Sequence, residues 1–363
     1  MKSAYIHIPF CKDICSYCDF CKMYYKSDWV DNYLEELEKE IKLNYKGEIL
    51  NTIYIGGGTP TSLSESQLER LFIILSNLNK DNFEYTIEAN VESLNIEKIK
   101  LFKKYGINRV SLGIQSIVDD NIKFLNRHHD KNMVIDCIKL LKEHGFNNIN
   151  VDLIYGLPNQ TIDVLKQDID FILSLDINHV STYSLIIEEN TKLAINKVKN
   201  IDEELDYQMY KYICDRLNND FIHYEISNFA KTGFESKHNL TYWNNECYYG
   251  FGLGASGYIN NIRYDNTRSL SSYLKGNHRI NIDKLDLNTK IENEFILGLR
   301  KIKGINKDIF YQKYNIKLEN IEIVKKLLKE KKLIDDKENI FINEKYIYVS
   351  NSILIEFIGG SYG

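Results

Sequence analysis

The sequence has few prolines, little net charge and no long hydrophobic run. Its 363 residues include 46 basic and 51 acidic side chains, which gives a net charge of −5. No long basic run occurs, so nucleic acid is not expected as the main partner. The most apolar segments, such as LFIILSNL, are far shorter than the roughly 20 residues that span a bilayer. Because no secretory signal precedes the first strand-like run either, we expect a cytoplasmic protein with no membrane anchor.

Proline occurs only three times, at Pro9, Pro60 and Pro158. Each proline stands beside the end of an expected strand. Proline fixes φ and removes a backbone donor, so it stiffens the turn in which it lies. Three stiff turns at strand ends fit a preorganised site at one rim of a barrel.

Short runs rich in β-branched and aromatic residues alternate with amphipathic stretches in the first half of the chain. The expected strands cover 4–8, 51–55, 83–89, 109–114, 149–154 and 179–185. Six strand–helix units with short connections predict a parallel sheet, either a partial barrel or an open doubly wound sheet. Asp28 is expected to cap the helix at 29–43, and Ser64 with Gln67 resembles a capping box for the next helix.

The second half of the chain has a different character. The pattern weakens around 192–202, and a glycine- and aromatic-rich stretch covers 242–259. Three helices are expected at 289–300, 306–314 and 318–334, followed by a hairpin at 340–350, an arrangement of winged-helix type. We therefore expect the strand–helix units, whether barrel or open sheet, over residues 1–200, a region that extends them over 201–284 and a small helical, winged domain over 285–363.

Four of the seven cysteines lie within CKDICSYCDFC, residues 11–21. In a reducing compartment, clustered cysteines indicate metal ligands or catalytic thiols before disulfides. Structural zinc commonly takes two distant cysteine pairs, and no second pair is present. Cys11, Cys15 and Cys18 could instead hold three corners of a [4Fe–4S] cluster and leave the fourth iron open. The scattered cysteines are expected in the core or at its boundary; they are Cys137, Cys214 and Cys247.

The spacing C-x₃-C-x₂-C directly after a first strand resembles the radical S-adenosylmethionine superfamily. The resemblance implies a partial (β/α)6 barrel with a [4Fe–4S] cluster at its C-terminal mouth. It also implies that the open iron binds S-adenosylmethionine, which the cluster cleaves to a radical. The motif YIGGGTPT at 54–61 adds support, because consecutive glycines let the backbone approach a ligand closely. No GK[ST] follows these glycines, as a phosphate loop would require.

Polar residues at strand ends extend the resemblance to the subfamily that contains the oxygen-independent coproporphyrinogen III dehydrogenase. The S-adenosylmethionine contacts that it implies are Tyr5, Tyr17, Gly57, Gly58, Thr59, Glu88, Gln115, Arg127 and Asp152. Ile186 replaces an alanine that helps to line a second S-adenosylmethionine site in the dehydrogenase. This larger residue weakens the expectation of a second bound molecule.

Two features separate this chain from the dehydrogenase. Phe20 stands where the dehydrogenase has a further cysteine, and we expect no counterpart of the extension that precedes the first strand there. The motif H-N-x-x-Y-W resembles the signature of the haem chaperone family called HemW. That resemblance implies haem contacts at His238, Asn239, Tyr242 and Trp243, since imidazole can ligate iron and aromatic faces can stack on a macrocycle. In the alternative interpretation these aromatics pack between barrel and tail, with His238 hydrogen-bonded in place.

The sequence therefore predicts a haem chaperone that carries a [4Fe–4S] cluster and S-adenosylmethionine. Expected partners are haem, recipient haem proteins (membrane respiratory enzymes among the candidates) and a second copy of the chain in a homodimer. The rival interpretations are coproporphyrinogen III dehydrogenase, by radical oxidative decarboxylation, and a radical enzyme on another substrate. Catalysis by the radical site is left open, and coproporphyrinogen oxidation is not expected.

Overall fold

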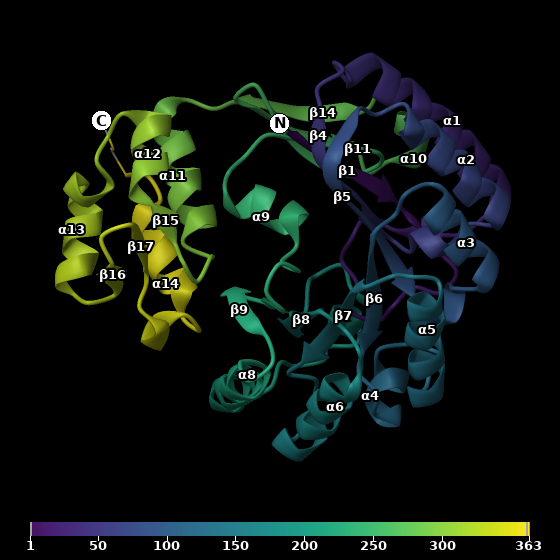
Figure 1. Cartoon of the computed structure of the whole chain (residues 1–363), viewed down its shortest axis with the longest axis horizontal. Helices are drawn as coiled ribbons and strands as arrows, with labels where there is room; N and C mark the ends of the chain where they lie inside the picture. The colour runs from purple at the N-terminus through teal and green to yellow at the C-terminus, as the bar shows by residue number, and fades with distance from the viewer. Residues whose placement is uncertain (1, 361, 363) are drawn as a thin grey trace.

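The computed structural model of the chain describes residues 2–360 and 362. Six parallel strands form the centre of a twelve-stranded sheet, in which they neighbour one another in chain order. They are β1 (Lys2–Ile8), β4 (Leu50–Gly57), β5 (Lys80–Asn90), β6 (Arg109–Gln115), β7 (Asn148–Tyr155) and β8 (His179–Ser184). All six expected strands are present, and the sheet curves as an open, partial barrel with helices on its outer side (Figure 1). The predicted fold class is confirmed.

Helices connect or follow the central strands, and most of them cover the outer face of the sheet (Figure 1). They are α1 (Ser27–Asn44), α2 (Glu65–Ser76), α3 (Ile96–Lys104), α4 (Asp119–Phe124), α5 (Lys131–Glu143), α6 (Ile162–Ser174), α7 (Lys192–Ile195) and α8 (Glu203–Leu217). In β4, Ile53 and Ile55 belong to the large apolar core, whereas Thr52 and Tyr54 bond groups inside the barrel. This alternation is what a strand with one apolar and one polar face requires.

One of the two helix caps follows the prediction. Ser64 and Gln67 form the expected capping box, because each side chain accepts from the other residue's backbone N–H at 3.3 Å. The prediction for Asp28 was wrong. Helix α1 begins at Ser27, its N-cap Lys26 makes no side-chain cap, and Asp28 lies in the first turn. A carboxylate there complements the positive end of the helix dipole instead of capping it.

Residues beyond α8 add strands to both edges of the central sheet. On one side β11 (Tyr248–Phe251) pairs in parallel with β1, and β12 (Ser256–Ile259), β13 (Ile262–Asn266) and β14 (Arg279–Lys284) continue antiparallel. On the other side lie β10 (Asn228–Ala230) and β9 (Ile222–Glu225). The short helices of this region are α9 (Lys237–Trp243) and α10 (Leu270–Tyr273).

A buried carboxylate ties this extension to the barrel. Glu40 of α1 accepts hydrogen bonds from Gly252 N at 2.8 Å, Asn266 Nδ2 at 2.6 Å and Tyr273 Oη at 2.6 Å. Burial raises the pKa of Glu40. The three donors come from β13, α10 and the residue after β11, so one side chain joins three elements of the extension to α1.

The C-terminal segment has its own apolar core, in which Phe295 stacks on Phe357. Its elements are α11 (Leu287–Gly298), β15 (Ile305–Asn306), α12 (Lys307–Tyr314), α13 (Glu322–Lys329), β16 (Leu333–Asp335), β17 (Asn339–Ile342) and α14 (Ser350–Leu354). The three expected helices are present, but the hairpin joins β16 to β17 and was predicted too far along the chain. Asn343 explains the difference, because its side chain accepts from Lys345 N and caps a helical turn directly after β17.

No helix in the described part of the chain combines the length and apolar character that a membrane crossing requires.

Candidate cluster and cofactor site

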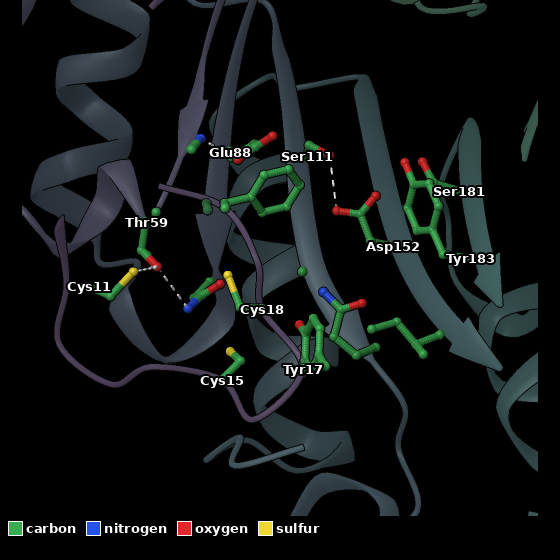
Figure 2. Close-up of a pocket in the computed structure, with 18 of the residues that line it drawn as sticks. Cys11, Cys15, Tyr17, Cys18, Thr59, Glu88, Ser111, Asp152, Ser181 and Tyr183 are labelled. Atoms are coloured by element: carbon green, nitrogen blue, oxygen red, sulfur yellow. Dashed lines mark hydrogen bonds between the residues drawn. The ribbon is translucent and has the colours of Figure 1, made fainter. Parts of the chain in front are cut away.

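A cavity of about 350 Å³ lies at the carboxyl ends of the parallel strands, where barrel folds place their sites. The loop after β1 closes one side of it, and inward-facing residues of β4 to β8 form the rest (Figure 2). Strand register brings the inward residues together: Glu88 pairs with Ser111, Ser111 with Asn150, and Asp152 with Ser181. The barrel interior is therefore a polar surface that faces the cysteines.

The three predicted ligands, Cys11, Cys15 and Cys18, all line this cavity. Short strands β2 (Phe10–Cys11) and β3 (Met23–Tyr24) pair with each other and close the intervening loop. Two donors approach the sulfurs: Thr59 Oγ1 lies 3.6 Å from Cys11 Sγ, and Arg127 Nη1 lies 3.7 Å from Cys15 Sγ. Donors of this kind stabilise thiolates and orient metal ligands.

The three thiols supply soft donors of the kind that iron–sulfur clusters take. Within residues 2–360 and 362, no three His, Cys, Asp or Glu side chains converge on one ion position. A four-iron cube binds each cysteine through a different iron, so its ligands stand apart. Burial raises the pKa of Cys11 to about 12 and raises that of Cys18. A buried thiol of this kind ionises when a metal replaces its proton.

Cys21 lies outside this set, because it does not line the cavity. Its carbonyl accepts a hydrogen bond from His7 Nε2 at 2.7 Å. Its sulfur packs close to Gly254, and the Arg268 guanidinium contacts it. Arg268 Nη2 also donates to Asp19 O at 2.8 Å, so this arginine holds the end of the cysteine loop.

The glycine motif packs directly against the cysteine loop. Gly58 N donates to Ile8 O at 2.8 Å, and Thr59 N donates to Phe10 O at 2.9 Å. Gly57 has a φ of +116°, which favours glycine, and its N–H donates to Glu88 Oε2 at 3.1 Å. The predicted residues Gly57, Gly58 and Thr59 therefore line the cavity and hold its two walls together.

Two buried carboxyl groups face the cavity. Glu88 accepts from Tyr54 Oη at 2.8 Å, and burial with the nearby Asp152 raises the pKa of Glu88 to about 7. Asp152 accepts from Asn150 Nδ2 at 2.8 Å and from Ser111 Oγ at 3.4 Å, and burial raises its pKa as well. Perturbed carboxyl groups in a cavity are typical of binding sites, where they accept from ligand hydroxyl or amino groups.

Eight of the nine residues predicted to contact S-adenosylmethionine line the cavity: Tyr17, Gly57, Gly58, Thr59, Glu88, Gln115, Arg127 and Asp152. Arg127 donates to Gly113 O at 2.6 Å and lies 3.5 Å from Glu92. Tyr5 lies behind the cavity wall, where its hydroxyl is 3.0 Å from His7 Nδ1. Tyr5 therefore reaches the cysteine loop through His7 and the carbonyl of Cys21.

The H-N-x-x-Y-W motif lies on α9 at the amino-terminal end of the barrel. His238 Nδ1 is 2.6 Å from Thr52 Oγ1, its Nε2 is 2.8 Å from Tyr242 Oη, and its ring stacks on Tyr54. Burial lowers the pKa of His238 to about 3, so the imidazole is neutral. This is the arrangement of the alternative interpretation, in which His238 is hydrogen-bonded in place.

The other motif residues face two different spaces. Asn239 lines the cavity that holds the cysteines. Tyr242 and Trp243 line a separate groove of about 510 Å³, together with Tyr248, Tyr258 and Arg263. The motif therefore separates the barrel interior from an aromatic groove, and the structure does not gather its four residues around one ligand position.

Sequence reasoning missed several residues that line the cavity: Asn90, Arg109, Ser111, Asn150 and Ser181. The signal that could have found them is strand parity, because Arg109 and Ser111 stand at even spacings before Gln115 on β6. Two apolar residues line the mouth. Phe20 and Ile186 are each 68% exposed and belong to the cavity wall.

Comparison with known proteins assigns this arrangement to a class. The profile of the radical SAM superfamily matches residues 5–172. A solved structure of coproporphyrinogen III oxidase (HemN) from Escherichia coli has the same fold, with a TM-score of 0.86 at 21% identity over 99% of this chain and 90% of that one. The fold and the site define a radical SAM protein, and membership implies a [4Fe–4S] cluster and S-adenosylmethionine.

Curated relatives narrow the class to one family. The heme chaperone HemW of Lactococcus lactis is 42% identical over 98% of this chain and 97% of its own length. The heme chaperone HemW of Bacillus subtilis is 41% identical over 99% of this chain and 100% of its own. The chain belongs to the HemW family.

Proposed function

We propose that this protein carries haem in the cytoplasm and delivers it to recipient haem proteins. One observation carries the proposal: two relatives named heme chaperones match the chain over nearly its full length at more than 40% identity. The similarity continues through the second half of the chain, which the superfamily profile does not match. Membrane respiratory enzymes are candidate recipients, and the homodimer remains a prediction.

In this proposal Cys11, Cys15 and Cys18 bind the [4Fe–4S] cluster. The eight predicted residues that line the cavity hold S-adenosylmethionine beside it, and Tyr5 supports that wall through His7. When bound, the two groups supply one-electron chemistry. Thr59 and Arg127 steady the cluster by donating to its cysteines, and Glu88 and Asp152 accept from the ligand.

The haem contacts are proposed at the H-N-x-x-Y-W motif. Tyr242 and Trp243 give the groove of about 510 Å³ aromatic walls, which suit a flat macrocycle, and Arg263 can pair with a propionate. For His238 to ligate the iron, its Nε2 must first release the Tyr242 hydroxyl. Haem binding is therefore coupled to a rearrangement of α9, whose Asn239 also lines the cluster cavity.

A radical reaction on a substrate inside the barrel is the second candidate function. The cavity holds more polar residues than the predicted cofactor contacts account for, which favours this function. The additional residues are Asn90, Arg109, Ser111, Asn150 and Ser181.

An anaerobic haem titration of the cluster-reconstituted protein, followed by its Soret absorption, tests the proposal. We expect stoichiometric binding that His238→Ala weakens at least about tenfold, as for loss of an interaction worth 1.4 kcal/mol or more. His144→Ala is the matched control, because among the described residues the His144 side chain bonds only Leu140 O of its own helix. Absence of haem binding, with conversion of coproporphyrinogen III by the same preparation, would overturn the proposal in favour of the dehydrogenase.

A further inference from the structure

Arg109 is a buried cation that faces the cavity and forms no ion pair within the described part of the chain. It is the first residue of β6, it is 1% exposed, and it lines the same cavity as the cysteines. Among the described residues, its Nε has no hydrogen-bond partner, and no carboxylate forms an ion pair with its guanidinium. Burying a charge is costly unless it is paired, so this position calls for an anion.

The acidic groups near Arg109 are engaged elsewhere. Glu84 accepts from the backbone N–H groups of Lys237 and His238, each at 3.1 Å. Glu88 accepts from Tyr54 and Gly57, and Asp152 accepts from Asn150 and Ser111. Arg109 therefore acts on Glu88 and Asp152 only at a distance, by lowering the pKa of each carboxyl, while their hydrogen bonds go to other donors.

The polar groups beside Arg109 divide into paired and unpaired ones. Asn150 Oδ1 shares a hydrogen bond with His179 Nδ1 at 2.6 Å, and its Nδ2 donates to Ser111 Oγ at 2.7 Å. Thr86, the register neighbour of Arg109 on β5, keeps a buried hydroxyl with no partner in the described chain. Unsatisfied groups therefore gather at the level of Arg109, one step deeper in the barrel than Ser111.

We propose that Arg109 is the anchor of a subsite for an organic carboxylate at the floor of the barrel. A guanidinium presents a planar pair of donors that matches a carboxylate in two parallel hydrogen bonds. A singly charged anion suits the site better than a phosphate, because Glu88 and Asp152 line the same cavity. Asn239 of α9 also lines the cavity, and its amide can donate to the same ligand.

Arg109 is not one of the predicted S-adenosylmethionine contacts, although its charge acts on two of them, Glu88 and Asp152. Arg109 and Gln115 lie at opposite ends of β6, six residues or about 20 Å apart along an extended strand. A ligand anchored at Arg109 enters carboxylate first and extends toward the cysteines. The acid is either a free short-chain carboxylate or the propionate of a tetrapyrrole, and the subsite does not depend on the haem proposal.

The test measures the unfolding temperature of the reconstituted protein with sodium propionate and with propionamide, its neutral analogue, at matched ionic strength. We expect propionate to raise the unfolding temperature and propionamide to leave it unchanged. In Arg109→Gln the apparent Kd for propionate should rise at least about tenfold, the loss expected for a hydrogen bond to a charged group. Arg109→Lys should bind propionate with intermediate affinity, because lysine keeps the positive charge but lacks the planar pair of donors. Arg216→Gln, which removes an exposed arginine paired with Asp170, should bind propionate as the wild type does.

Equal stabilisation by propionate and propionamide would overturn the subsite. No effect of either compound would also overturn it and would mean that water alone solvates the Arg109 guanidinium. Unchanged propionate affinity in Arg109→Gln would also overturn it. If the Arg109 variants fail to fold, as judged by circular dichroism, the comparison of the two probes on the wild type still decides.

A competition with haem and haem dimethyl ester identifies the source of the carboxylate. Displacement of propionate by haem but not by its ester supports the subsite as one for a tetrapyrrole propionate. Haem binding without displacement supports it as a subsite for a free acid. Propionate binding with no haem binding leaves the subsite standing and overturns the proposed haem function, so the two can fail separately.

Discussion

Gly58 packs so closely against Cys11 that a β-carbon at position 58 would lie 2.9 Å from the cysteine sulfur and 2.8 Å from the Pro9 carbonyl carbon. The glycine motif and the cysteine loop are therefore one packed unit. Its two halves come from β4 and from the segment after β1, and they are held together by backbone hydrogen bonds from Gly58 and Thr59. The geometry of the proposed cluster ligands depends on a residue that carries no side chain.

The substitution Gly58→Ala should reduce cluster occupancy after reconstitution by more than half. Overpacking a fitted contact costs about 1–3 kcal/mol, and here the contact is the sulfur of Cys11, a proposed cluster ligand. Iron and sulfide analysis measures the loss. Gly106→Ala is the control for a general loss of stability: its φ of +80° disfavours alanine, but it lies outside the cavity lining and its added β-carbon would meet no atom within 4 Å, so it should keep its iron. Full iron content in Gly58→Ala would show that the two segments are not rigidly coupled.

Serine substitutions should separate the four clustered cysteines into two groups. Cys11→Ser, Cys15→Ser and Cys18→Ser should each lose most of the bound iron, because each removes one cluster ligand. Cys21→Ser should keep it, because Cys21 does not line the cavity and offers its carbonyl to His7. Anaerobic reconstitution, followed by iron analysis and visible absorption, measures how much cluster each variant retains. Iron loss in Cys21→Ser equal to that in Cys18→Ser would contradict this ligand set.

The stability of the protein should depend on pH through Glu225. Burial raises the pKa of this carboxyl from 4.5 to about 7, although Asn228 Nδ2 and Ser227 N donate to it. The folded state favours the protonated acid. The stability that Glu225 contributes is therefore fully present below the pKa of the unfolded state and disappears as pH rises through about 7. Between about pH 5 and pH 8, the unfolding free energy of Glu225→Gln should fall by up to about 3 kcal/mol less than that of the wild type. Urea unfolding across this range checks the prediction, and a slope equal to that of the wild type would contradict it.

The hydrogen bond between Tyr242 and His238 should restrain haem ligation. Tyr242→Phe removes the hydroxyl that occupies His238 Nε2 at 2.8 Å and keeps the aromatic wall of the groove. We expect haem affinity to rise several-fold, since the net value of such a hydrogen bond is about 0.5–1.5 kcal/mol. Optical titration measures it. Weaker binding in Tyr242→Phe would indicate that the hydroxyl itself holds the ligand.

Local sequence features predicted the strands and brought the three cysteines to one cavity, because both depend on short patterns. The strand runs are marked by β-branched residues, and the cysteine loop is fixed by the spacing of Cys11, Cys15 and Cys18. Residues missed by the prediction depend on register. Arg109 and Asn150 share the cavity only because β6 and β7 pair in parallel with Arg109 opposite Asn148.

The position of the H-N-x-x-Y-W motif could not be predicted from its composition. His238 meets Thr52, a residue 186 positions away, and nothing in either local sequence indicates that contact. The hairpin error has a local cause instead. The alternating run after β17 favours a strand, and the side chain of Asn343 ends it by capping a turn.

Transfer of haem from the loaded protein to an apo-haem protein tests the central claim most directly. The rate of transfer is compared with the rate at which haem dissociates into a scavenger that does not contact the carrier. The account predicts transfer to a true recipient that is faster than spontaneous dissociation. Transfer no faster than dissociation for every recipient tested, or retention of haem, would contradict a chaperone that delivers its cargo.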